Sequence, residues 1–134
     1  MAYPTVKSFR FERDAQAAAH AREAVRKVAQ DVPPETLSDL LLCVTELVTN
    51  SVTHSESGEI VEMAVRRDDG RLRVEVVDRG SGFDESRATA HDPATAEQRE
   101  RGWGLYIVSV LADEWGVEPG ELTRVWFEKD VSGR

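Results

Sequence analysis

The sequence predicts an α/β (α+β) two-layer sandwich, with helices on one face of a mixed, largely antiparallel sheet. Two observations lead to this prediction. Segments of alternating and of helical periodicity follow one another as strand, two helices, two strands, helix and two strands. The chain has 134 residues, of which 40% are hydrophobic, so it is long enough to bury one core. We therefore expect residues 1–134 to form a single domain.

The first strand and the first helix are read from the N-terminal 30 residues. Phe9 and Phe11 alternate with polar residues within Thr5–Glu12, which predicts a strand. Residues Asp14–Gln30 are rich in alanine and repeat apolar residues at helical spacing, and Asp14 is the expected N-cap. The apolar face of this helix comprises Ala18, Ala21, Val25 and Val28.

A second helix is predicted to run from Thr36 to about His54. Thr36 precedes Leu37, and Asp39 stands three residues after the threonine, which resembles a capping box with Asp in place of Glu. Seven apolar residues at about 100° per residue form a stripe that we expect to face the sheet. They are Leu37, Leu40, Leu41, Val44, Leu47, Val48 and Val52.

The second half of the chain begins with the clearest hairpin. Ile60–Arg66 and Leu72–Asp78 alternate in polarity on either side of "DDG", a strong turn signal. Residues Phe83–Arg101 are polar and without a period, which predicts a long loop that is either functional or disordered. "LYIVSVLADEW" then predicts a third helix, and the last two strands are expected at Trp115–Val117 and Arg124–Glu128.

The composition limits which classes of partner the protein is expected to bind and in which compartment it is expected to lie. A net charge of −8 argues against a direct nucleic-acid partner and against an anionic membrane surface, since both require clustered Lys and Arg. No apolar run approaches the roughly 20 residues that cross a bilayer, and the N-terminus lacks the pattern of a signal peptide. Cys43 is the single cysteine, which rules out an internal disulfide and agrees with a cytoplasmic location.

Glu46 and Asn50 are the candidate chemical groups on the second helix. They stand four residues apart, so their oxygens share one side of the helix, and no Lys or Arg occurs between Leu37 and Ser55. Hard oxygen ligands completed by water and phosphate suit Mg²⁺. The alternative is a solvated helix face. The pair indicates a metal site only if a phosphate site lies beside it.

Two glycine pairs supply a candidate phosphate site. Asp78 ends a strand before Gly80 and Gly82, and Gly102 and Gly104 precede the third helix. Exposed N–H groups at a glycine-rich helix start bind anions. Glycines that merely form turns are the alternative for either pair alone. Neither pair matches a P-loop or a dinucleotide-binding fingerprint.

In this order, "ELVTNSVTH", "DRGSG" and "RGWGL" resemble the N box, the D-x-G-x-G box and the G-x-G box of the GHKL (Bergerat-fold) ATPases. The resemblance extends from Phe9 to Glu128. Within that superfamily the chain is most similar to bacterial anti-sigma-factor serine/threonine kinases and their single-domain ATP-binding relatives. The resemblance therefore implies a Bergerat ATP-binding fold.

The resemblance also implies a role for each matching residue. Asn50 would coordinate Mg²⁺, Glu46 would act as general base, and Asp78 would accept a hydrogen bond from the adenine amino group. Residues 83–101 would form the ATP lid. Thr123 stands near the position of an adenine-contacting threonine, although Arg124 follows it directly. The remaining nucleotide contacts would come from Gly80, Gly82, Gly102, Gly104 and, toward the γ-phosphate, Arg101.

The function that the resemblance implies is an ATP- and Mg²⁺-binding anti-sigma factor with serine/threonine-protein kinase activity. Its partners would be a sigma factor and a STAS-type anti-anti-sigma antagonist, and a homodimer is left open. A catalytically silent, ATP-dependent binding module is the main alternative, and Glu46 favours the enzyme because binding alone does not need a base. The ATPase domain of a histidine kinase is the third reading, which the short chain disfavours.

Overall fold

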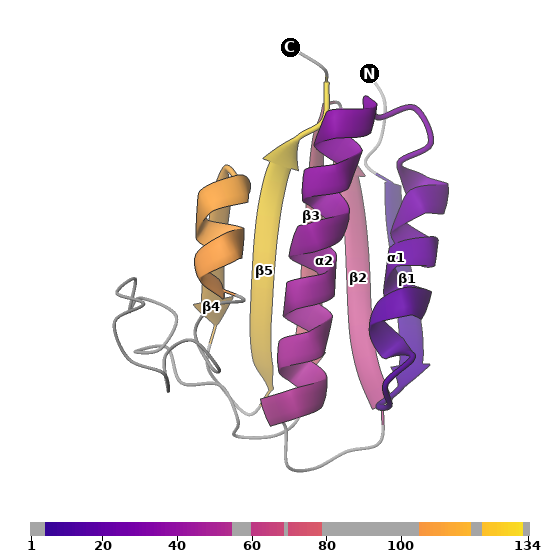
Figure 1. The fold of residues 1–134 in the computed structure, drawn as a ribbon, viewed down its shortest axis with the longest axis vertical. Helices are drawn as coiled ribbons and strands as arrows, with labels where there is room; N and C mark the ends of the chain where they lie inside the picture. Colours follow the sequence, from indigo (N-terminus) through magenta and orange to yellow (C-terminus); the bar gives the residue numbers. More distant parts are fainter. Residues whose placement is uncertain (1–4, 55–59, 69, 79–104, 119–121, 133–134) are drawn as a thin grey trace.

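A computed structural model describes residues 5–54, 60–68, 70–78, 105–118 and 122–132. Strands and helices follow one another in the predicted order (Figure 1), and residues 105–111 are helical between the third and fourth strands. The other elements are β1 (Thr5–Glu12), α1 (Ala17–Val28), α2 (Pro34–His54), β2 (Ile60–Asp68), β3 (Arg71–Asp78), β4 (Glu114–Glu118) and β5 (Thr123–Asp130).

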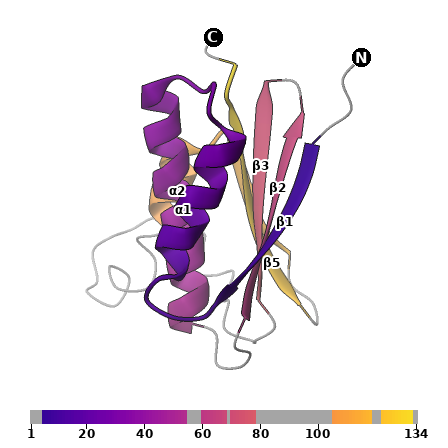
Figure 2. The same cartoon turned by 90° about the vertical axis from the view of Figure 1, so that its right-hand side faces the viewer.

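The strands form one five-stranded sheet in the order β1-β2-β3-β5-β4. Every pairing between neighbouring described strands is antiparallel, so no parallel pair of the expected mixed sheet is found among them. Figure 2 shows the helices together on one face of this sheet, with the other face uncovered by helices. The predicted two-layer α/β architecture is confirmed.

The core lies between α2 and the sheet. The predicted apolar stripe of α2 is confirmed, since its central residues are buried and its two end residues, Leu37 and Val52, are partly buried against the core. Its buried members are Leu40, Leu41, Val44, Leu47 and Val48, and they meet Val61, Met63, Val65, Val74, Val76 and Phe127 of the strands. None of the described helices is long and apolar enough to span a membrane.

Helix α1 packs beside α2 through small side chains. Ala17, Ala21 and Val25 are fully buried, and alanines permit a close approach between the two helices. The predicted cap at Asp14 is wrong, because α1 begins after Gln16. Asp14 instead forms a turn ahead of the helix, where its Oδ1 accepts a hydrogen bond of 2.8 Å from the Gln16 N–H.

Helix α2 begins two residues earlier than expected. Pro34 is its first residue, a position that suits proline because the first N–H groups of a helix have no internal partner. The predicted capping box of Thr36 and Asp39 is therefore wrong, since both residues lie inside the helix. Asp39 lies 3.9 Å from the Lys129 ammonium group on β5.

The β2–β3 hairpin is confirmed, and both strands are longer than predicted. Asp68 pairs with Arg71, so the strands continue up to the turn. Gly70 has a φ of +85°, a backbone conformation that glycine adopts without strain. The glycine of the turn signal "DDG" is therefore explained by the positive φ that the chain adopts at this position.

The third helix ends earlier than expected. Residues 105–111 are helical, and β4 already begins at Glu114, where the sequence predicted continued helix. Lys129 of β5 donates a hydrogen bond of 2.6 Å to the Leu111 carbonyl, which places a cation at the C-terminus of this helix. The size of both tryptophans favours a place in the core. Trp115 does pack against the core, whereas Trp126 lies on the outer face of the sheet, so that expectation is wrong for Trp126.

Candidate functional site

Glu46 and Asn50 lie on the C-terminal half of α2, the part of the magenta helix nearest the bottom of Figure 1. Their spacing separates them by about 6 Å along the helix axis on one side of the helix. This side is not a solvated face, because Asn50 is buried and Glu46 is partly buried. The solvated-face alternative therefore does not describe these two residues.

Asn50 combines burial with an unused hydrogen-bonding group. The residue is 8% exposed, and its Nδ2 has no hydrogen-bond partner among the described residues. A buried amide with unused capacity costs free energy unless a ligand or water completes it. No cluster of three or more His, Cys, Asp or Glu exists in the described part of the chain. The side-chain oxygen of Asn50 is a hard ligand of the kind that Mg²⁺ takes in small number together with water and substrate phosphates.

Glu46 occupies an environment that suits a base. Burial raises the pKa of its carboxyl above the ordinary value of 4.5, because the charged form loses solvation. A raised pKa moves the basicity of a carboxylate toward neutral pH, where it accepts a proton more readily. The position one turn before Asn50 places this carboxylate next to any group that Asn50 helps to bind.

Thr123 and Asp78 lie opposite each other at the same end of the sheet. Asp78 is the last residue of β3, Thr123 is the first of β5, and the two are register partners. Thr123 is 5% exposed and shares the inner face with Val125 and Phe127. Arg124 is on the opposite face, where it donates a hydrogen bond of 3.2 Å to Glu118, so it does not block the inner face at Thr123.

The other predicted nucleotide contacts lie outside the described residues. These are Gly80, Gly82, Arg101, Gly102, Gly104 and the predicted lid at residues 83–101. Their roles stay predictions. The structure brings Asn50 and Glu46 together on α2 and pairs Asp78 with Thr123 at the neighbouring strand ends.

Ser51 is a buried polar residue that the sequence reasoning did not select. It is 1% exposed, and its Oγ has no hydrogen-bond partner among the described residues. Its position continues the sheet-facing stripe, three and four residues after Val48 and Leu47. A polar residue at an apolar position of the periodic pattern was the available signal.

Cys43 and His20 are two further residues whose side chains are able to react. Cys43 is fully buried, and burial raises the pKa of its thiol to about 12, which keeps it protonated. Cys43 therefore serves as a small buried residue of the core. His20 is exposed on α1 and lies against Phe11, with ring centroids 6.4 Å apart.

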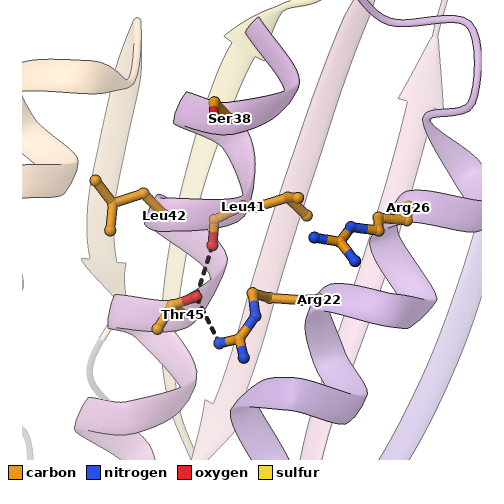
Figure 3. Close-up of a pocket in the computed structure, with 6 residues that line it drawn as sticks. All are labelled: Arg22, Arg26, Ser38, Leu41, Leu42 and Thr45. Carbon is orange, nitrogen blue, oxygen red and sulfur yellow. Dashed lines mark hydrogen bonds between the residues drawn. The ribbon is translucent and has the colours of Figure 1, made fainter. Parts of the chain in front are cut away.

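A shallow cavity of about 390 Å³ lies between α1 and α2, well before Asn50 on the helix. Figure 3 shows Arg22 and Arg26 reaching toward it from α1. Arg22 donates a hydrogen bond of 3.0 Å to the Thr45 hydroxyl, which itself donates to the Leu41 carbonyl at 2.8 Å. The cavity contains none of the predicted nucleotide-binding residues, so we assign it no part in nucleotide binding.

Comparison with known proteins agrees with the resemblance seen in the sequence. A family model described as a histidine kinase-like ATPase domain matches residues 11–129. An anti-sigma F factor of Caldanaerobacter subterraneus is 28% identical over 98% of this chain and 97% of the relative. A serine-protein kinase RsbW of Bacillus pumilus is 37% identical over 71% of this chain, and the match covers 65% of that kinase.

Solved structures give the same fold. The RsbU and RsbW domains of Rv1364c from Mycobacterium tuberculosis match with a TM-score of 0.68 at 16% identity, covering 95% of this chain and 32% of that one. The SiaB–SiaC complex from Pseudomonas aeruginosa matches with a TM-score of 0.60 at 14% identity, covering 92% of this chain and 88% of that one. These likenesses confirm the predicted fold class.

Proposed function

The chain belongs to the histidine kinase-like ATPase family, and on this premise we propose that it is an anti-sigma factor with serine/threonine-protein kinase activity. Its substrates would be Mg-ATP and a serine or threonine of an anti-anti-sigma antagonist. Its relatives include proteins named anti-sigma F factor and serine-protein kinase RsbW. The proposal includes a cytoplasmic location, where a sigma factor would be held.

The observation that carries the proposal is the buried Asn50 amide one turn after the partly buried Glu46. Asn50 would hold Mg²⁺ through its side-chain oxygen. The metal, when bound, neutralises phosphate charge and helps to orient the phosphates. The unused donor of Asn50 is then free for a water or phosphate oxygen, which removes the cost of burying it.

Glu46 would carry the proton transfer. The substrate hydroxyl oxygen forms a bond to the γ-phosphorus, its proton passes to the Glu46 carboxylate, and ADP leaves. The carboxylate must be ionised for this step, and burial raises its pKa above the ordinary value because the charged form loses solvation. A protein that only binds ATP has no use for such a base.

The adenine ring of the nucleotide would be recognised at the paired ends of β3 and β5. Asp78 would accept a hydrogen bond from the adenine amino group, where guanine presents a carbonyl instead. Thr123, the register partner of Asp78, is buried on the inner face of the sheet. This arrangement supports ATP rather than GTP as the nucleotide.

Phosphotransfer from labelled ATP tests the proposal. The protein is incubated with Mg²⁺, γ-labelled ATP and a candidate anti-anti-sigma antagonist, and the label is expected on a serine or threonine of the antagonist. The variant Glu46→Gln is the control for the chemical step. Tight ATP binding without transfer to any antagonist would favour the catalytically silent binding module instead.

A further inference from the structure

We propose that Lys129 is a positioning residue for the phosphate end of the nucleotide. It would act through helix 105–111, because its side chain joins the C-terminal end of that helix to β5 and to α2. The proposal rests on the proposed function, since it assumes that the nucleotide binds beside α2 as that function requires. It adds a residue that would touch no part of the ligand.

The first observation is the burial of the Lys129 side chain. Lys129 alternates along β5 with the buried Val125 and Phe127, and only 13% of its side chain is exposed. Lysine side chains usually keep their charged end in water. Withdrawing an ammonium group from water costs free energy, which an apolar side chain of similar length would avoid. Packing alone therefore does not explain a lysine at this position.

The second observation is that the ammonium group lies against two helices. Lys129 donates a hydrogen bond of 2.6 Å to the carbonyl of Leu111, the last residue of helix 105–111, and its Nζ lies 3.9 Å from the Asp39 carboxylate on α2. In Figure 1, β5 runs between α2 and helix 105–111, which is drawn in orange. The last carbonyl groups of a helix lack internal partners and carry partial negative charge, so a cation is favourable there.

The third observation is that the chain just after this helix is also held to β5. The Asp113 N–H donates a hydrogen bond of 2.9 Å to the Glu128 carbonyl. The Asp113 carboxylate accepts one of 2.6 Å from the Asp130 N–H. Together with the Lys129 contact, these bonds fix where the helix ends on the sheet.

The fixed end matters because the two helices carry groups for the same part of the ligand. The glycine pair before this helix, an expected phosphate contact, ends directly before Leu105. Helix α2 carries Asn50 and Glu46, the proposed metal ligand and base. A displacement of about 1 Å in such groups can lower a rate about 10²-fold. The adenine ring, expected at the paired ends of β3 and β5, would not depend on the position of this helix.

Calorimetric titrations of Lys129→Met with Mg-ATP and with adenosine test the proposal. The affinity for Mg-ATP is expected to fall about tenfold, because the phosphate contacts are displaced. The affinity for adenosine, which has no phosphate, is expected to stay at the wild-type value. The melting temperature of the nucleotide-free protein is expected to stay near the wild-type value, because the removed cost of burying the ammonium group offsets the lost hydrogen bond. A lysine with a purely structural role would instead lower that temperature and leave the ratio of the two affinities unchanged.

Lys7→Met is the matched control, since Lys7 is an exposed strand lysine on β1. The control is expected to bind both ligands as the wild type does. An unchanged ratio of the two affinities in Lys129→Met, or a variant that does not fold, would overturn the proposal while leaving the proposed function intact. A wild type that binds ATP without phosphotransfer would overturn the kinase activity alone, and a wild type that binds no ATP would overturn both.

Discussion

The outer face of the sheet and the C-terminal end of α2 both carry polar side chains, but the two regions differ in whether these side chains have hydrogen-bond partners. On the outer face, Arg73 donates to Glu75 at 2.9 Å and to Glu128 at 2.8 Å, and Arg71 donates to Glu128 at 3.0 Å. At the end of α2, the Asn50 Nδ2 and the Ser51 Oγ are buried without partners among the described residues.

The outer face also accommodates an aromatic ring within its ion pairs. The Arg73 guanidinium lies 4.1 Å from the ring centroid of Trp126, a cation–π distance. A Cβ at Gly116 on β4 would lie 2.9 Å from this ring, so glycine is what lets the ring lie against the strand. The paired charges and the packed ring indicate that this face stabilises the fold.

This difference indicates where a ligand belongs. Polar groups that serve the fold find their partners within the chain, whereas groups that serve a ligand stay unsatisfied until the ligand binds. The comparison therefore predicts that substitutions at the end of α2 change nucleotide binding and transfer. Substitutions on the outer face should change stability alone.

Asn50→Ala is expected to have the largest effect. It removes the proposed metal ligand, so Mg-ATP affinity should fall by at least about tenfold and phosphotransfer should be lost. Calorimetry and the labelled-ATP assay measure the two effects. Thr49→Ala, on the exposed side of the same helix turn, is the control and should behave as the wild type. Unchanged affinity in Asn50→Ala would remove Asn50 from the site.

Glu46→Gln should separate chemistry from binding. The amide keeps the size of the side chain but does not take a proton, so transfer should fall by about 10²–10⁴ while ATP affinity stays near the wild-type value. Glu35→Gln, in the exposed first turn of α2, is the matched control. A parallel loss of binding and transfer would show that Glu46 positions the ligand instead.

The pH dependence of transfer follows from the same carboxylate. Burial raises the pKa of Glu46, and only the ionised form is a base, so the rate should fall as the pH drops through a value above the ordinary 4.5. A pH–rate profile of kcat at saturating ATP measures this limb. The limb should be absent from the residual activity of Glu46→Gln, and a profile identical to the wild type would contradict the assignment.

The smallest effect is expected on the outer face, at Glu128. Its hydrogen bond with Arg73 lowers the pKa of this carboxyl below the ordinary 4.5, so the unfolded chain binds the proton more readily. The stabilisation is therefore complete above about pH 4.5 and is lost as the pH falls further. Glu128→Gln should cost roughly 1 kcal/mol of unfolding free energy at pH 7 and leave ATP affinity unchanged.

Urea unfolding at pH 7 and at pH 3.5 measures the Glu128 effect, with Glu12→Gln on the exposed end of β1 as control. The difference between wild type and Glu128→Gln should shrink at the lower pH. A changed ATP affinity in Glu128→Gln would contradict the prediction that substitutions on the outer face change stability alone.

Periodicity and spacing predicted much of this architecture. The apolar stripe of α2 and the alternation in β2 and β3 each follow one regular repeat, so the layers and the placement of Glu46 beside Asn50 could be expected. The boundaries were less predictable. Pro34 begins α2 because a first-turn proline loses no helical hydrogen bond, and that competes directly with the capping signal at Thr36.

Trp126 and Ser51 are two residues whose environments the sequence pattern does not predict. Trp126 alternates with the inward-facing Val125 and Phe127, so its outer position follows from strand geometry, yet its size suggested the core. Ser51 is not part of a stripe defined by apolar residues, although it lies at the same helical spacing. The satisfaction of its hydroxyl depends on three-dimensional partners, which no spacing in the sequence specifies.

A crystal structure with Mg²⁺ and a non-hydrolysable ATP analogue would show whether the nucleotide binds beside Asn50 and Glu46. We expect the Asn50 side-chain oxygen at about 2.1 Å from the metal. We also expect the Glu46 carboxylate beside the γ-phosphate, and the adenine next to Asp78 and Thr123. A nucleotide seated elsewhere, such as in the cavity between α1 and α2, with the Asn50 and Ser51 side chains still unpartnered, would contradict the proposed site.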